Sequence, residues 1–512
     1  MDTESVRPAV TELRLSAFKS HRGATFPLGP LTLLTGASGS GKSSVLQAYE
    51  ILARLGSGAR LGRAVAVAPG GAAGCVPVWA RPDSQGRRGF RIGCTVDGPV
   101  GPVRLDVAVQ AEPELRIVGE RLTGGGETLL STALTDPARR AVQAAWYTAG
   151  STPVTRAPLP DDRLGTALLP LRVAGKTAGQ RLVLAAAEQV VVALRSVFAC
   201  DPRPEVMRGA GPGGEGWARP GGVSGAAPGG GGVSGAGRGA GRSGAGGSGG
   251  GSGGSSGSGG GGVTSVISGV GAGAPDGSGE ADGGGGGGGG DMAGGSGGAG
   301  APVDASGSRV RAEAGLSGGF AGASGGDGMA DDGGTFGGHW GWSAGDGRLR
   351  TACDNLPAVL GRTSRECARR HTVLVEAVRA GCVGPVEGLR AEPVERGGTV
   401  GIQALVERGA LPAMPLEQLG DGELRYVALA LVLLTGPEVL EMDPAGEVLS
   451  ARQVLGLMAD GLDRCLDGRQ SRALLELAVR MVGRGHIRLL GTVRDASAAE
   501  GLPEVRVLHL GV

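Results

Sequence analysis

The amino-acid sequence predicts an α/β protein whose main sheet is parallel and is assembled from both ends of the chain. Apolar, strand-like segments alternate with helical segments near the N-terminus and again near the C-terminus, a pattern typical of a parallel sheet covered by helices. Between residues 90 and 122 apolar and polar residues alternate instead, which predicts an antiparallel β-meander. The middle of the chain is therefore expected to be inserted into a sheet built by the two ends.

The N-terminal half is predicted to hold the first strands, an amphipathic helix and the meander. The helix is expected where apolar side chains recur at helical spacing, and the turns of the meander at Asp97-Gly98 and Glu112-Pro113. In chain order we predict strands at Leu13–Leu15 and Leu31–Thr35, a helix at Ser43–Leu55, meander strands near Phe90–Val96, Val103–Val109 and Leu115–Leu122, and helices at Ala138–Tyr147 and Gln180–Cys200.

The C-terminal half is predicted to return to alternating helices and strands. Its most apolar segment, Glu423–Leu434, indicates a buried helix. In chain order we predict helices at Leu349–Leu360 and Ser364–Ala380, strands around Glu387–Pro393 and Val400–Val406, a helix at Glu423–Leu434, a short buried strand at Val439–Met442, mostly helix over Gln453–Val482 with a break at Asp467-Gly468, and strands at Ile487–Val493 and Val505–Leu510.

A glycine-rich tract separates the two halves. Glycine accounts for 106 of the 512 residues, and more than half of it lies between Gly209 and Gly347. Such a tract cannot bury enough apolar surface to offset the entropy of ordering its backbone, so we predict that it is a disordered insertion. Arginine beside glycine occurs there only at Arg238 and Arg242, which is too sparse to favour RNA binding.

Composition narrows the classes of function. The net charge of +1 provides no whole-chain field for holding nucleic acid or an anionic membrane, and leaves only a local basic patch for such a role. The cysteines are odd in number and include no C-x-x-C pair, which indicates reduced cytosolic thiols and neither a disulfide framework nor a zinc site. The N-terminus lacks the pattern of a signal peptide, and Val427–Leu434 is too short to span a bilayer. We expect a soluble, cytoplasmic protein.

A phosphate-binding loop stands between the second predicted strand and the first predicted helix. In a G-x-x-x-x-G-K-S loop, backbone N–H groups converge on phosphate oxygens, Lys42 pairs with the β- and γ-phosphates, and the Ser43 hydroxyl binds Mg²⁺. A chance loop in a glycine-rich protein is the alternative, but the flanking strand and helix favour a nucleotide site. The expected ATP-binding residues are Gly36, Ala37, Ser38, Gly39, Ser40, Gly41, Lys42, Ser43 and Ser44.

A second segment indicates which class of ATPase this is. Leu416–Tyr426 reads L-E-Q-L-G-D-G-E-L-R-Y, and the apolar helix and the acidic end of Val439–Asp443 follow it. This order resembles the signature motif, helix and Walker B strand of ABC-class ATPases of the SMC/RecF-like branch. Thr11–His21 resembles the opening strand of that family, and Asp354–Leu360 resembles a helix of its RecF-like members. The resemblance covers roughly residues 10–200 and 348–512.

The resemblance implies a P-loop NTPase fold, namely an ABC-type nucleotide-binding head with an antiparallel β-subdomain and a helical lobe. The absence of heptad repeats argues against a long coiled-coil arm. The domains expected on this basis are residues 10–135 for the N-terminal half of the head, 136–207 for the first part of the helical lobe, 208–347 for the glycine-rich insertion, 348–385 for the second part of the lobe, and 386–512 for the C-terminal half of the head.

In this family two heads dimerise around two ATP molecules, so the resemblance implies an ATP-dependent homodimer. Gly420, Asp421 and Gly422 of one copy would bind the γ-phosphate held by the other. An Asp-Gly turn that merely caps a buried helix is the alternative reading of this motif. The resemblance also implies that Ser43 and Asp443 hold Mg²⁺.

The catalytic positions depart from the pattern of the family. Relatives carry a water-orienting Glu after the Walker B Asp, whereas Pro444 follows Asp443 here, and Glu447 is either a displaced general base or a solvated loop carboxylate. Gly420 replaces the signature Ser. The last strand lacks the His that senses the γ-phosphate, and His486, which precedes that strand, is expected to be a structural or surface histidine. For the Q-loop glutamine, Gln85 and Gln110 are candidates by position only.

Three functions remain open at this point. The first is a slow ATPase, using Lys42, Asp443 and Glu447, whose ATP-bound heads dimerise and switch the interaction with an unknown protein partner. The second is a regulatory or scaffold protein that binds ATP without hydrolysing it. The third is an ATPase that handles DNA, which the balanced charge disfavours.

Overall fold

The computed structural model describes residues 7–148, 155–209, 347–396, 399–442 and 453–511. The predicted disordered insertion at residues 208–347 falls almost entirely outside these ranges. Asp443 and Glu447, the predicted Walker B aspartate and general base, also lie outside the described residues.

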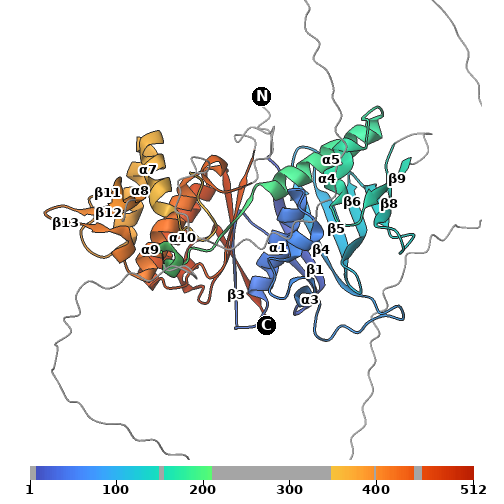
Figure 1. The fold of residues 1–512 in the computed structure, drawn as a ribbon, viewed down its shortest axis with the longest axis horizontal. Coiled ribbons are helices and arrows are strands. Elements are labelled where there is room, and N and C mark those ends of the chain that lie inside the picture. The colour runs from blue at the N-terminus through green and yellow to red at the C-terminus, as the bar shows by residue number, and fades with distance from the viewer. Residues whose placement is uncertain (1–6, 149–154, 210–346, 397–398, 443–452, 512) are drawn as a thin grey trace, which may run out of the picture. The chain divides into compact units, whose positions relative to one another are not determined.

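A parallel sheet joins the two ends of the chain, as the sequence predicts. Its order is β10-β14-β15-β3-β16, and each neighbouring pair is parallel. The N-terminal strand β3 therefore lies between two C-terminal strands, which Figure 1 shows as blue beside orange and red. The strands are β3 (Leu31–Gly36), β10 (Val197–Cys200), β14 (Leu455–Ala459), β15 (Ile487–Thr492) and β16 (Val505–Leu510).

The predicted meander is part of a larger antiparallel sheet of order β2-β1-β4-β5-β6-β7-β8-β9. Its three predicted strands are confirmed as β4, β5 and β6, each paired with the next in antiparallel register. The strands are β1 (Ala9–Phe18), β2 (His21–Pro27), β4 (Arg88–Asp97), β5 (Val103–Glu112), β6 (Arg116–Gly124), β7 (Glu127–Ala133), β8 (Ala141–Trp146) and β9 (Thr155–Pro160).

The helix predicted at Ala138–Tyr147 is wrong, because this segment contains strand β8. Its side chains alternate between intermediate and buried, with Val142, Ala144 and Trp146 facing the core. That period of two matches a strand, and β8 pairs with β7 on one side and β9 on the other. Pairing with two neighbouring strands decides the structure of this segment.

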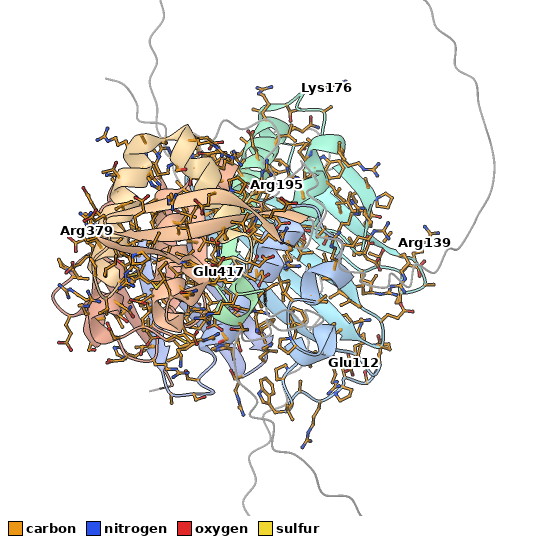
Figure 2. The ribbon with its side chains drawn as sticks, turned by 60° about the vertical axis from the view of Figure 1, so that its left-hand side comes forward. Glu112, Arg139, Lys176, Arg195, Arg379 and Glu417 are labelled. Atoms are coloured by element: carbon orange, nitrogen blue, oxygen red, sulfur yellow. The ribbon has the colours of Figure 1, made fainter. Side chains whose placement is uncertain are left out.

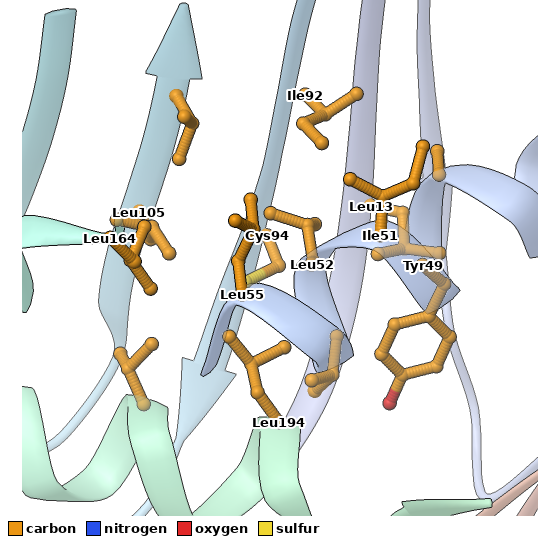
Figure 3. Close-up of a cluster of buried hydrophobic side chains, with 14 of the residues drawn as sticks. Leu13, Tyr49, Ile51, Leu52, Leu55, Ile92, Cys94, Leu105, Leu164 and Leu194 are labelled. Carbon is orange, nitrogen blue, oxygen red and sulfur yellow. The ribbon is translucent and has the colours of Figure 1, made fainter. Parts of the chain in front are cut away.

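Helix α1 (Lys42–Gly56) follows the phosphate-loop motif and confirms the predicted helix. Its apolar face packs onto the antiparallel sheet and onto α5 (Ala178–Arg195). In Figure 3, Leu52 and Leu55 of α1 lie near Cys94 of β4 and Leu194 of α5. Arg195, labelled in Figure 2, donates from Nε to the carbonyl oxygen of Gly56 at 3.2 Å. The predicted helix Gln180–Cys200 ends at Arg195, because the residues after it pair with β14 as β10.

The second half packs long helices around the buried helix α9, which begins at Asp421. The Tyr426 hydroxyl of α9 donates to the carbonyl oxygen of Ala377 at 3.0 Å, and its ring fills the space beside Gly381, where a Cβ would overlap it. The helices are α7 (Leu356–Glu366), α8 (Ala368–Gly381), α9 (Asp421–Leu434) and α10 (Gly468–Val482), and an antiparallel sheet adds β11 (Gly388–Arg396), β12 (Thr399–Arg408) and β13 (Leu411–Pro415).

Short helical segments complete the described chain. The α-helical ones are α2 (Leu61–Val65), α3 (Gly71–Cys75), α4 (Gly165–Leu168) and α6 (Pro204–Met207), and the 3₁₀ ones are η1 (Leu169–Leu171), η2 (Leu416–Gln418), η3 (Pro437–Val439) and η5 (Ser497–Ala499). None of the helices in the described ranges combines the length and apolarity needed to cross a membrane. All seven cysteines carry free thiols.

Two predictions near the C-terminus are wrong, and they concern the position of the Walker B strand. Val439–Met442 is not a strand of the parallel sheet, because η3 ends at Val439 and Leu440 makes only an isolated bridge with Leu349. Because Leu349 takes part in this bridge, the helix predicted from Leu349 begins only at Leu356.

The long helix predicted over Gln453–Val482 divides into strand β14 and helix α10. A short apolar run shows no clear period, and pairing with β10 and β15 makes it a strand.

Candidate functional site

The glycine-rich loop turns tightly between β3 and α1. Gly36, Gly39 and Gly41 adopt φ values of 142°, 84° and 95°, in the region where a side chain is strained. The Lys42 ammonium folds back over this loop and donates to the carbonyl oxygens of Gly36 at 2.6 Å and Ala37 at 3.0 Å. The sequence-predicted loop residues therefore surround one lysine at the N-terminus of a helix.

Substitution of Gly36 with alanine is expected to destabilise the protein by about 2–4 kcal/mol, because strain at positive φ adds to overlap with the backbone. A Cβ at Gly36 would overlap the carbonyl oxygen of Leu510 on β16. Gly39→Ala is the matched control, since its φ is also positive but its Cβ would meet nothing within 4 Å. Urea denaturation measures both free energies of unfolding. Equal losses in the two variants would contradict the close contact between the loop and β16.

The loop opens into a cavity of about 910 Å³. Of the described residues that line it, four carry cationic side chains and one carries a carboxylate, so the cavity favours a polyanion. The lining comes from the β1–β2 turn, the glycine-rich loop and the C-terminal ends of β14 and β15. These residues are Lys19, Ser20, Gly36, Ser38, Gly39, Gly41, Lys42, Ser43, Ser44, Asp460, Gly461, Arg464, Thr492, Val493 and Arg494.

Asp460, which was not among the residues predicted from the sequence, is the carboxylate that faces Ser43. The Ser43 hydroxyl donates to the two carboxylate oxygens of Asp460 at 3.1 and 3.0 Å. The Thr492 hydroxyl donates to Oδ1 of Asp460 at 2.6 Å and accepts from the backbone N–H of Gly461 at 2.7 Å. Asp460 follows β14 directly. The signal that could have found it is the apolar run Leu455–Ala459 ending in an aspartate, which is the form of a Walker B strand.

The oxygen atoms of Ser43 and Asp460 fit a magnesium ion. Mg²⁺ binds through one or two carboxylates together with waters and substrate phosphates, and a hydroxyl beside a carboxylate at the edge of a phosphate-binding loop matches that set. Both side chains are reached from the cavity. Asp460 is thus the described carboxylate beside Ser43, whereas Asp443, which the resemblance implied for this role, lies outside the described residues.

The β1–β2 turn closes one wall of the cavity. The Lys19 ammonium donates to the side-chain oxygen of Gln47 on α1, and partial burial lowers the pKa of Lys19. The His21 ring donates from Nε2 to the carbonyl oxygen of Gly41 at 3.2 Å. A Cβ at Gly41 would lie 2.5 Å from that nitrogen. The turn therefore packs directly on the start of α1.

The predicted signature residues form the N-terminus of α9 and do not line this cavity. Gly420 and Asp421 are exposed, and the backbone N–H of Gly420 donates to the Glu423 carboxylate at 3.2 Å. A Cβ at Gly422 would overlap the carbonyl oxygen of Cys465, in the loop after Asp460. The segment is thus both a helix cap and a close neighbour of the loop that carries Asp460.

Arg425 joins α9 to the backbone at Asp460. Its side chain is 1% exposed. Its Nη2 donates to the carbonyl oxygens of Asp460 at 3.2 Å and Gly461 at 2.9 Å, and its Nη1 donates to the carbonyl oxygen of Pro202 and to Asp201. One buried guanidinium therefore connects the signature helix, the Asp460 loop and the segment after β10.

No carboxylate follows Asp460, because the next residue is Gly461. Asp463 lies in the same loop, but its Oδ2 accepts from the backbone N–H groups of Arg494 at 2.7 Å and Asp495 at 3.1 Å. Among the described residues that line the cavity, Asp460 is the only one with a carboxylate. The described part of the site thus contains no second acid that could orient a water.

The remaining candidates from the sequence lie elsewhere. Neither Gln85 nor Gln110 lines the cavity; Gln85 occupies a turn beside Asp83, and Gln110 donates to the carbonyl oxygen of Glu114. His486 precedes β15, is exposed, and its Nδ1 contacts Nη1 of Arg7 at 2.9 Å.

Comparison with known proteins finds similar structures and no sequence match. No protein-family model and no curated protein sequence matches the chain. The chain is similar to an SMC head bound to the C-winged helix domain of ScpA (TM-score 0.39, 10% identity, covering 96% of this chain and 92% of that one). It is similar to the SMC head domain from Thermotoga maritima (TM-score 0.33, 10% identity, 96% and 91%).

RecF with ATP is similar over a shorter part, with a TM-score of 0.18, 14% identity and coverage of 25% of this chain and 30% of that chain.

Proposed function

We propose that this chain binds Mg²⁺·ATP in the cavity above the glycine-rich loop and hydrolyses it slowly. The observation that supports this most directly is the contact between Ser43 and Asp460. It places a hydroxyl and a carboxylate, from opposite ends of the sequence, beside a lysine-bearing loop.

The cavity has the charge and the donors that a triphosphate requires. Lys42 lies at the N-terminus of α1, where the helix dipole and free N–H groups favour anions. Lys19, Arg464 and Arg494 add positive charge at the walls. Magnesium, when bound, would neutralise part of the charge of a triphosphate. The residues of this chain would hold it through Ser43 and Asp460.

Slow turnover follows from the residue next to Asp460. Hydrolysis of a phosphoanhydride needs an oriented water, and a carboxylate commonly orients it. Gly461 stands at that position. ATP binding depends on the loop and on Ser43 and Asp460. We therefore expect the protein to bind ATP well and to hydrolyse it slowly.

We further propose that nucleotide-bound copies pair through the signature segment Gly420–Gly422. This segment begins the fourteen-residue helix α9, is exposed at Gly420 and Asp421, and does not line the cavity of its own copy. The Gly420 N–H already donates to Glu423, so we propose that the N–H groups of Asp421 and Gly422 meet an anion presented by a second copy. Pairing of this kind would let the nucleotide state control the binding of a protein partner.

Calorimetric titration of the full-length protein with ATP, with and without Mg²⁺, tests the binding proposal. We expect binding that Mg²⁺ strengthens, and a loss of about tenfold or more in Lys42→Ala, which removes a charge-assisted contact. Absence of binding in the wild type, or an unchanged affinity in Lys42→Ala, would refute the proposal. Light scattering with and without nucleotide tests the pairing of copies.

A regulatory protein that holds ATP without hydrolysing it is the second candidate, and Gly461 beside Asp460 favours it. The two candidates differ in the fate of the bound nucleotide. Phosphate release above the Lys42→Ala background supports a slow ATPase, whereas recovery of intact ATP from the protein after many hours supports the second candidate.

A further inference from the structure

The guanidinium of Arg464 lies against Gly461, in the space where any other residue at position 461 would place its Cβ. The residue after Asp460 is Gly461, with φ 61°, and a Cβ built on it would lie 3.0 Å from Nε and 3.2 Å from Nη2 of Arg464. The backbone N–H of Arg464 donates to the carbonyl oxygen of Gly461 at 2.9 Å. A cation therefore lies beside Asp460 in the cavity.

Arg464 is held only loosely. Its Nη1 lies 3.7 Å from Oδ1 of Asp201, and the Arg464 side chain is 45% exposed. Asp201 also pairs with Arg203 at 3.1 Å and contacts Arg425 at 3.4 Å. An exposed ion pair at this distance contributes little, whereas a phosphate offers a guanidinium two charge-assisted hydrogen bonds. A phosphate within reach would thus compete successfully for Arg464.

The order of the strands places Arg464 near the expected position of the terminal phosphate of a bound triphosphate. The glycine-rich loop follows β3, whereas Arg464 belongs to the loop after β14, and β15 lies between these two strands. Neighbouring strands are about 4.8 Å apart, so the two loops start roughly 10 Å from each other. A phosphate chain anchored at the loop and at Ser43 has its terminal group nearer to β14.

We infer that Arg464 binds the terminal phosphate of a nucleoside triphosphate in exchange for Asp201, and so makes the site prefer a triphosphate to a diphosphate. The inference rests on the proposed function. On this inference Arg464 makes the protein bind ATP more tightly than ADP. Arg464 lies beside Gly461, the position at which relatives carry a water-orienting acid.

Calorimetry with ATP and with ADP, both with Mg²⁺, tests the inference in the full-length protein. Arg464→Ala is expected to weaken ATP binding by about ten- to hundredfold, the value of a charge-assisted hydrogen bond, and ADP binding by less than about threefold. Arg464→Lys should recover part of the ATP affinity, because it keeps the charge but not the bidentate geometry.

Arg203→Ala is the matched control. Arg203 also pairs with Asp201 and is 56% exposed, but it does not line the cavity. It should leave both affinities within about twofold, as expected for an exposed pair. Equal weakening of ATP and ADP in Arg464→Ala, or no weakening of either, would overturn the inference and leave the nucleotide site intact. A wild type that binds neither nucleotide would overturn the proposed function itself.

Discussion

Asp460→Asn is expected to abolish the strengthening of ATP binding by Mg²⁺. Asparagine keeps the size of the side chain and one oxygen acceptor, so contacts with Ser43 and Thr492 can persist. It removes the negative charge that a hard divalent cation needs. Because loss of a mere outer-shell partner costs about 10–100-fold in metal affinity, loss of a direct ligand should cost more than about 100-fold. Titration of ATP at several Mg²⁺ concentrations measures this effect.

Asp443→Asn is the control for this experiment, because the sequence order suggested Asp443 as the metal ligand. Asp443 lies outside the described residues, and the proposal assigns the metal to Asp460. Asp443→Asn should therefore keep the dependence on Mg²⁺. The opposite result, with Mg²⁺ dependence lost in Asp443→Asn and kept in Asp460→Asn, would show that the Ser43–Asp460 contact is not the metal site.

Arg425→Ala is expected to lower the free energy of unfolding by about 3–5 kcal/mol, the usual cost of breaking a buried charged network. Arg425 is 1% exposed and donates to the carbonyl oxygens of Pro202, Asp460 and Gly461. Its removal takes the buried guanidinium donor away from the carbonyl oxygens of Pro202 and Asp460. The Gly461 carbonyl keeps its bond from the Arg464 N–H, and Asp201 keeps its pair with Arg203. Urea denaturation of the full-length protein measures the change.

Two further variants distinguish the network from a general effect of losing an arginine. Arg54→Ala removes an exposed pair with Glu50 one helical turn away, and should cost less than about 0.5 kcal/mol. Arg425→Lys keeps the charge but cannot donate to two separate groups of carbonyls, so it should remain destabilised by more than about 2 kcal/mol. An Arg425→Ala loss no larger than that of Arg54→Ala would contradict the role of the network.

Local patterns were sufficient to predict the phosphate-binding loop and the parallel sheet. The loop Gly36–Ser43 depends on residues adjacent in sequence, and its conformation needs glycine at defined positions. Helix α1 shows a helical period that reports its buried face, and β3 is a short, continuously buried run that feeds the loop. The association of the two chain ends follows from the rules of parallel connection, and β3 lies between β15 and β16 accordingly.

Contacts between distant segments decided the rest. Five apolar residues before Asp460 have no readable period, and only pairing with β10 and β15 makes them a strand. The segment at β8 likewise became a strand because two neighbours supply its hydrogen bonds. The sequence by itself therefore determined that a phosphate-binding loop ends a buried strand. The tertiary structure decided that Asp460 faces Ser43, because side chains 417 positions apart meet only through the order of the strands that carry them.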